Sequence, residues 1–181
     1  MILGLKRGEV VLAAHQHEWS LLFEEEKRLL REVLGTSLLA IEHIGSTAVA
    51  DLSAKPVIDI AILVGSFEDI EPWPEILDRH GYTYWGDREG RNDHFFAKGP
   101  DESRTYYLHV VAVSGVEWDN YLKFRDALRN QPQVRLAYEK LKQQALAAYR
   151  HDRKAYTQAK HDFIQSVLNG PLLPPCSPPR K

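Results

Sequence analysis

The sequence predicts an α+β domain whose helices lie mainly toward its C-terminal end. Three observations support this class: an amphipathic helical stretch near the N-terminus, short apolar runs separated by turn residues in the middle, and helical spacing over most of the rest. The length suits one well-filled core, so we expect a single domain over residues 1–170. Residues 171–181, which are rich in proline, predict an extended or disordered tail.

The N-terminal half predicts one helix followed by two inner strands. Residues 15–34 place their large apolar side chains on one helical stripe, and Gly35 follows as a stop signal. Residues 38–44 and 57–64 are short and apolar, which is typical of buried strands.

The middle of the chain predicts a short helix and three more strands. Residues 66–80 favour a helix that prolines delay and that Gly81 ends. The loops that follow are rich in turn formers. They separate three strand-like pieces, residues 82–85, 93–98 and 104–113.

The C-terminal part predicts helices. Ser114 and Glu117 have the spacing of a capping box before a helical pattern, and Pro132 begins a second helix. The pattern continues or restarts over residues 149–168 and ends at Gly170.

The composition excludes several classes of protein. Lys plus Arg total 23 and Asp plus Glu total 25, so no strong field favours DNA, RNA or an acidic membrane. No apolar stretch reaches the length of a membrane span, and the first residues lack the apolar centre of a secretory signal. Cys176 alone cannot form a disulfide framework. We therefore expect a cytoplasmic protein.

Polar groups interrupt the two inner strands. Asp59 is flanked by apolar residues, and a carboxylate there is costly unless it is paired, hydrogen-bonded or bound to a metal. The alternative is a structural salt bridge, for example to Lys55, which could equally be a phosphate-binding cation or a solvated lysine. Gly45, Ser46 and Thr47 end the first strand and could cradle an anion, although an ordinary turn is the commoner outcome for such a tripeptide alone.

Strand alternation gives three polar faces that could converge. Asp59 lies on one face of its strand, His109 on one face of residues 104–110, and His94 with Lys98 on one face of residues 94–98. If these strands are neighbours and the faces coincide, the groups form a cleft at one edge of the sheet.

The remaining candidates have two interpretations each. His43, His94 and His109 match no compact zinc motif, and hydrogen-bonded sheet histidines are commoner than ligands. Lys160 shares a helical face with Arg153 and Tyr156, and together with Arg125 it could reach a polyphosphate. A charged outer face with local ion pairs is the alternative.

An ordered set of motifs resembles the GrpB family of bacterial proteins. The set is HIGSTAV, KPVIDI, HFFAKGP, TYYLHVV, KFRDALRNQPQV and DRKAYTQAKHDFI, over about residues 6–168. The resemblance implies a nucleotidyltransferase-like fold, with a mixed β-sheet on which the N-terminal helix and a C-terminal helical segment pack. Some members are fused behind dephospho-CoA kinase, which implies a link to coenzyme A synthesis.

The resemblance also implies a site. In the nucleotidyltransferase superfamily a Gly-Ser loop holds nucleotide phosphates and three acids hold Mg²⁺. Gly45 and Ser46 match that loop, and Asp59 matches the first acid and implied metal ligand. Ala61 stands at the second acid and His109 at the third. One aspartate with histidines is a poor site for two Mg²⁺ ions and suits another divalent cation or proton transfer better.

We therefore expect a protein that binds a nucleotide or another phosphate-bearing small molecule. Asp59 and His109 are the catalytic candidates if it transfers a nucleotidyl or phosphoryl group. The alternative is a non-catalytic module that binds a ligand or a partner protein. The predicted ligand-binding residues are Gly45, Ser46, Thr47, Lys55, His43, His94, Lys98, Arg125 and Lys160.

Overall fold

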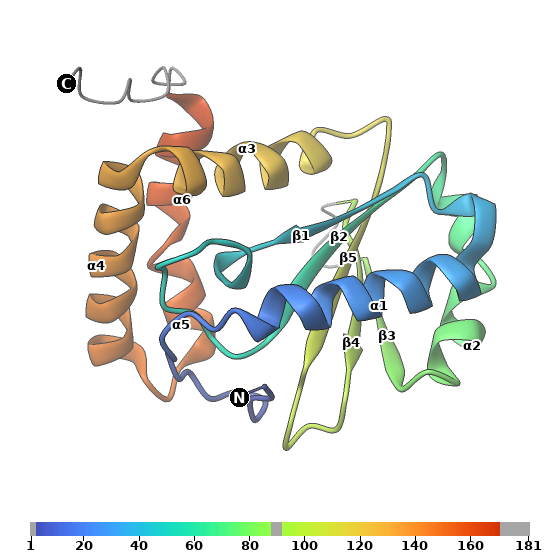
Figure 1. The fold of residues 1–181 in the computed structure, drawn as a ribbon, viewed down its shortest axis with the longest axis horizontal. Helices are drawn as coiled ribbons and strands as arrows, with labels where there is room; N and C mark the ends of the chain where they lie inside the picture. The colour runs from blue at the N-terminus through green and yellow to red at the C-terminus, as the bar shows by residue number, and fades with distance from the viewer. Residues whose placement is uncertain (1–2, 88–91, 171–181) are drawn as a thin grey trace.

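One mixed β-sheet organises the chain (Figure 1). The computed structural model describes residues 3–87 and 92–170. Within these residues five strands pair in the order β1-β2-β5-β4-β3. The central pair, β2 with β5, is parallel and the other pairs are antiparallel. The strands are β1 (Ala40–Ile44), β2 (Ile58–Val64), β3 (Tyr82–Asp87), β4 (His94–Lys98) and β5 (Tyr106–Ala112).

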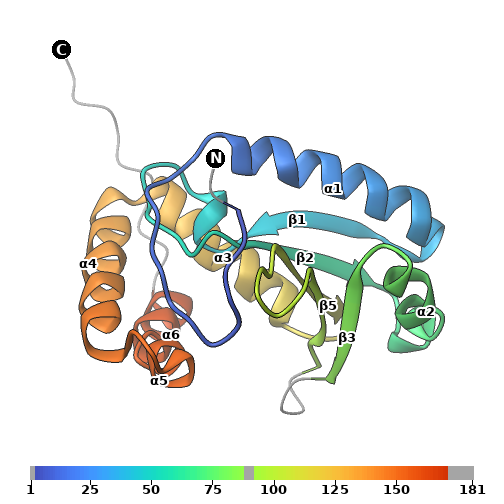
Figure 2. The same ribbon diagram turned by 90° about the horizontal axis from the view of Figure 1, so that it is seen from below.

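Helices cover both faces of this sheet (Figure 2). On one face α1 (Glu18–Leu34) buries its apolar stripe against the strands, with Trp19 and Leu30 fully buried. The short α2 (Trp73–Asp78) adds Trp73 and Leu77 to the same core. On the other face α3 (Glu117–Asn130) packs over β1, β2 and β5.

The remaining helices stand together at one end of the sheet (Figure 1). They are α4 (Pro132–Tyr149), α5 (Arg153–Gln158) and α6 (His161–Asn169). Of these, α4 and α6 pack with α3 around Tyr138, Leu128 and Phe163, while α5 packs on α4 through Tyr156. This helical group lies beside the loop that follows β1, so it can supply side chains to that end of the sheet.

The predicted α+β class, the mixed sheet and the helices packed on it are confirmed. The five strands begin and end within two residues of their predicted bounds, and the N-terminal helix starts at Glu18. The segment 66–80 splits into a 3₁₀ helix, η3 (Phe67–Ile70), and α2. The last helical pattern restarts as α5 and α6. The predicted tail lies outside the described residues.

The predicted capping box at Ser114 is wrong. Val116 occupies the N-cap of α3, and no side chain caps that helix. A capping box forms instead at Ser66, where the hydroxyl accepts from the Glu68 amide and Asp69 accepts from the Ser66 amide. Among the described residues, no helix combines the length and apolar character that a membrane span requires.

Candidate functional site

The loop after β1 is pressed against Asp59. Gly45 has a φ of +68°, and a Cβ atom at this position would lie 2.6 Å from Asp59 Oδ2. Only glycine combines this backbone conformation with such a close approach. The following residues form a single 3₁₀ turn, η2 (Ser46–Ala48), so the Gly-Ser-Thr loop lies against Asp59.

His43 holds this loop from the opposite side of the sheet. Its Nε2 atom is hydrogen-bonded to Thr47 Oγ1 at 2.9 Å, and its ring stacks on Phe23 with centroids 4.8 Å apart. Burial lowers the pKa of His43 to about 3, aided by Arg129 and opposed by Asp59. The imidazole is therefore neutral near pH 7. Because Ile44 and not His43 pairs with Asp59, the structure makes His43 a positioning residue of the loop.

A small cavity of about 100 Å³ opens beside the loop and Asp59. Its lining includes three lysines from three different segments: Lys55, Lys142 and Lys160. Leu12, Gly45, Ser46, Thr47, Ala54, Asp59, Phe124, Tyr138 and Tyr156 complete it. The structure thus brings six predicted site residues to one cavity: Gly45, Ser46, Thr47, Lys55, Asp59 and Lys160.

The charged groups around this cavity favour the binding of an anion. Burial, together with the charges of Lys55, Lys142 and Arg153 and against that of Asp59, lowers the pKa of Lys160 to about 7. Burial also lowers the pKa of Lys142 to about 8, although Glu139 lies 3.1 Å from its ammonium. A lysine whose charge is destabilised by neighbouring cations regains that charge when an anion enters.

Asp59 also begins a chain of polar contacts across the sheet. His109 Nε2 lies 3.8 Å from Asp59 Oδ1, and His109 Nδ1 lies 3.0 Å from Asp93 Oδ2. Tyr121 donates to the same Asp93 oxygen at 2.8 Å. Burial alone would raise the pKa of Asp59, but the nearby His109 imidazole and the charge of Lys55 hold it below its usual value. Asp59 is therefore an anion near pH 7.

Sequence reasoning missed Asp93 and Tyr121. A usable signal existed for Asp93, because it shares its period-2 face with Phe95, which pairs with His109. The residue predicted for the site was instead His94, the next in the chain, which lies on the opposite face of β4. Tyr121 comes from α3 and meets His109 only through packing, with ring centroids 5.2 Å apart. No local pattern in the sequence could have found it.

His94 and Lys98 do not join this site. Register pairs His94 with Val110 and Lys98 with Tyr106, so both side chains lie on the α1 face, opposite Asp59 and His109. The predicted convergence of their faces with the others is therefore wrong. Lys98 instead binds the buried Glu26 carboxylate at 2.7 and 2.8 Å. His94 Nδ1 lies 2.5 Å from the Tyr84 hydroxyl.

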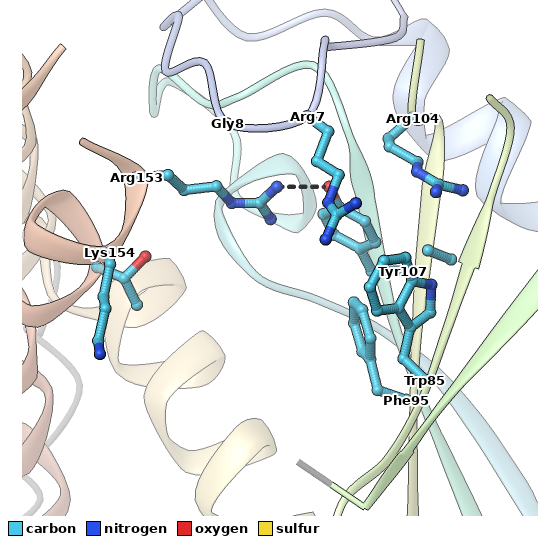
Figure 3. A pocket seen from close by; sticks show the side chains of 10 residues that line it. Arg7, Gly8, Trp85, Phe95, Arg104, Tyr107, Arg153 and Lys154 are labelled. Carbon is cyan, nitrogen blue, oxygen red and sulfur yellow. Dashed lines mark hydrogen bonds between the residues drawn. The ribbon is translucent and has the colours of Figure 1, made fainter. Parts of the chain in front are cut away.

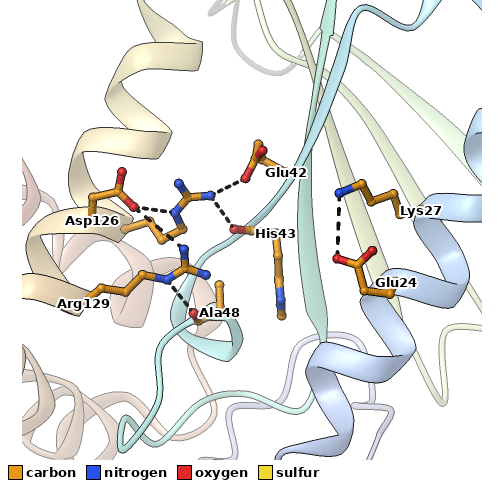
Figure 4. A network of polar contacts seen from close by, with 8 residues as sticks. Glu24, Lys27, Glu42, His43, Ala48, Asp126 and Arg129 are labelled. Carbon is orange, nitrogen blue, oxygen red and sulfur yellow. Dashed lines mark hydrogen bonds and ion pairs between the residues drawn. The ribbon is translucent and has the colours of Figure 1, made fainter.

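Arg125 is committed to a network between α3 and β1 (Figure 4). Its guanidinium donates to Glu42 Oε2 at 2.7 Å, to Asp126 Oδ1 at 2.8 Å and to the His43 carbonyl at 3.2 Å. Arg129 donates to the Ala48 carbonyl at 3.0 Å in the same network. Arg125 therefore fixes α3 against β1, Arg129 fixes it against η2, and Arg125 does not line the cavity.

The donor set does not fit a centre for two metal ions. Two Mg²⁺ ions need several carboxylates in octahedral oxygen geometry. Ala61, at the second acid position, is fully buried and apolar, and His109 separates Asp59 from Asp93. Over residues 3–87 and 92–170, no three His, Cys, Asp or Glu side chains are grouped as metal ligands. A single divalent cation on Asp59 stays a prediction.

The fold and site together define an α+β protein with a Gly-Ser-Thr loop over an aspartate at one end of a mixed sheet. The chain belongs to the GrpB family: the family model described as GrpB protein matches residues 9–170. The family resemblance drawn from the motifs is therefore confirmed.

Named relatives are similar over most of this chain. The glutamate-rich protein GrpB of Alkalihalophilus pseudofirmus is 37% identical over 172 residues, which cover 93% of this chain and 99% of that protein. UPF0157 protein YqkA of Bacillus subtilis is 33% identical over 90% of this chain but only 46% of its own length. The crystal structure of conserved protein GrpB from Enterococcus faecalis superposes with a TM-score of 0.80 at 32% identity, covering 87% and 94% of the two chains.

Proposed function

We propose that the protein binds a phosphate-bearing small molecule, of the nucleotide class, in the cavity between the Gly-Ser-Thr loop and Lys160. The observation that carries this proposal is the group of three lysines around one small cavity, whose described lining includes one acidic residue, Asp59. Hydroxyl groups of Ser46 and Thr47 line the same cavity and can donate to phosphate oxygens. Such a mixture of cations and hydroxyls is typical of anion sites.

The proposed anion contacts protein groups directly. The three lysines already supply positive charge, and the described acids are too few for a two-metal centre. We therefore expect binding of inorganic tripolyphosphate in the presence of a chelator. A requirement for Mg²⁺ would instead favour a cation held by Asp59.

Calorimetry with tripolyphosphate tests the proposal. Lys160→Gln removes one cavity cation and should weaken binding about tenfold, as loss of one close charge-assisted contact does. Lys140→Gln makes the same chemical change at an exposed position of α4 and should leave affinity unchanged. Equal affinities for Lys160→Gln and Lys140→Gln would contradict the proposed site.

The pH dependence gives a second check. Sulfate keeps its charge between pH 6 and 8, so only protein groups titrate in that range. With a pKa of about 7, Lys160 is mostly charged at pH 6 and mostly neutral at pH 8. Sulfate affinity should fall by about tenfold from pH 6 to 8, and Lys160→Gln should flatten most of that change. Equal profiles in the two proteins would remove Lys160 from the site.

A second candidate function, transfer of a phosphoryl or nucleotidyl group, is favoured by the contacts of His109. This imidazole lies between Asp59 and Asp93 and could exchange a proton at the edge of the cavity. Incubation with ATP, with and without Mg²⁺, followed by chromatography of nucleotides tests this candidate. Turnover that disappears in His109→Gln, while tripolyphosphate still binds, would support it. Binding of tripolyphosphate without turnover would favour the non-catalytic module.

A further inference from the structure

A second, larger cavity lies on the same face of the sheet as Asp59 (Figure 3). Its volume is about 420 Å³, within the range of small-molecule sites. The strand residues that form its floor, Phe95, Ala97 and Tyr107, share the face of Asp59 because β4, β5 and β2 are neighbours in register. The N-terminal segment and α5 form its walls through Arg7, Gly8, Arg153, Lys154 and Thr157.

The floor of this cavity is aromatic. Phe95 and Tyr107 pack with ring centroids 5.2 Å apart, and Trp85 joins them from β3. Trp85 is 43% exposed, which is unusual for a tryptophan in a position to join a core. The lining therefore presents flat ring surfaces to whatever enters.

Guanidinium groups stand over these rings. Arg7 lies 4.4 Å from the Trp85 ring centroid and Arg104 lies 5.8 Å from it. Asp101 holds both, accepting from Arg7 at 3.2 Å and also from Arg104. Asp101 thus ties both guanidinium groups beside Trp85, and the Arg7 guanidinium lies over the indole ring. Such pairs stack on nucleobases in proteins that bind nucleic acids.

The charge of the cavity complements an anion attached to such a ring. Four cationic residues, Arg7, Arg104, Arg153 and Lys154, are among its lining residues, and none of the described lining residues is acidic. A phosphate group alone would gain little from the apolar floor, since polar groups do not benefit from apolar contact. An aromatic ring that carries an anionic tail fits both features.

The linings of the two cavities meet at one register position of the sheet. Tyr107, in the floor of the larger cavity, is the register partner of Asp59, which lines the smaller one. Arg153, the first residue of α5, donates to the Tyr107 hydroxyl at 3.0 Å. The charge of Arg153 also contributes to the lowered pKa of Lys160, which follows α5 and lines the smaller cavity.

We propose that this second cavity holds the nucleobase of the phosphate-bearing ligand, stacked on Trp85 and contacted by the Arg7 guanidinium. This inference rests on the proposed phosphate site and specifies its ligand: a nucleoside phosphate rather than inorganic phosphate or a sugar phosphate.

Three probes separate the two cavities: adenosine, tripolyphosphate and ATP, each titrated by calorimetry at fixed salt. Trp85→Leu keeps apolar bulk but removes the stacking surface. It should lower the affinity for ATP and for adenosine about tenfold or more, which is the usual effect of losing one stacking aromatic side chain. The affinity for tripolyphosphate should not change. Lys160→Gln should lower the affinity for ATP and for tripolyphosphate and leave the affinity for adenosine unchanged. Trp118→Leu, outside both linings, is the matched control and should alter none of them.

The outcomes distinguish this inference from the proposed function. If Trp85→Leu leaves ATP affinity unchanged, or weakens tripolyphosphate as much as ATP, the base site is wrong. If wild-type protein binds adenosine in a Trp85-dependent manner but binds no tripolyphosphate, the phosphate site fails and the aromatic site stands. Unfolding temperatures of all variants, measured without ligand, show whether a loss of binding reflects a loss of fold. A Trp85→Phe variant, which restores a ring, should recover most of the ATP affinity.

Discussion

Protonation of His43 should destabilise the domain as the pH falls below neutrality. The imidazole is 5% exposed, and burial lowers its pKa from 6.5 to about 3. In the unfolded chain the His43 imidazole therefore becomes protonated near pH 6.5, whereas in the folded chain it becomes protonated only near pH 3. The stabilising effect of a neutral His43 is complete above pH 6.5 and is lost as the pH falls.

The magnitude follows from that difference in pKa. Linkage gives a loss of about 2 kcal/mol between pH 7.5 and pH 5, and about 5 kcal/mol if the pH falls below 3. A loss of about 2 kcal/mol is a large fraction of the stability of an ordinary domain.

Urea unfolding at pH 7.5, 6.0 and 5.0, followed by circular dichroism, measures this effect. The His43→Gln variant keeps a polar side chain next to Thr47 but has no group there that titrates. Over this pH range its free energy of unfolding should therefore fall by about 2 kcal/mol less than that of the wild type. The matched control is His151→Gln, at an exposed site, which should keep the wild-type slope. If wild type and His43→Gln lose the same free energy, a neutral buried His43 does not support the loop.

Three further substitutions test other parts of the structure. Gly45→Ala should lower the free energy of unfolding by about 1–3 kcal/mol in urea titrations, because it adds a Cβ atom 2.6 Å from an Asp59 oxygen at positive φ; an unchanged stability would contradict that close approach. Lys98→Met should cost about 3 kcal/mol, because it leaves the buried Glu26 carboxylate without its cation and with only the Tyr82 hydroxyl as a donor, yet tripolyphosphate affinity of the folded protein should not change; a specific loss of affinity would return Lys98 to the site. Asp59→Asn should strengthen metal-free tripolyphosphate binding several-fold in calorimetry at low salt, because it removes the carboxylate that lines the cavity and repels an anion. A sharp loss would show that a cation bridges Asp59 and the phosphate.

Local pattern was sufficient for the elements of this fold. The apolar stripe of residues 18–34 has helical spacing, and the apolar runs at β1, β2 and β5 are too short for helices and are bounded by turn residues. The Gly-Ser-Thr loop was also predictable, since a glycine after a strand, followed by two hydroxyl residues, is a local signal. Asp59 was conspicuous because a carboxylate within an apolar strand needs a partner. Those predictions depended on neighbours along the chain.

The sequence by itself determined the class of fold, the family, and half of the residues that line the cavity beside the Gly-Ser-Thr loop. Only the tertiary structure decided which polar faces coincide. Alternation shows that His94 and Lys98 share a face, but the register between β4 and β5 turns that face toward α1, away from Asp59. Asp93 and Tyr121 reach His109 from a loop and from α3, and Lys142 reaches the cavity from α4. These contacts join residues that are far apart in the chain. They depend on how the helices and strands pack, and the periodicity of a single segment does not determine that packing.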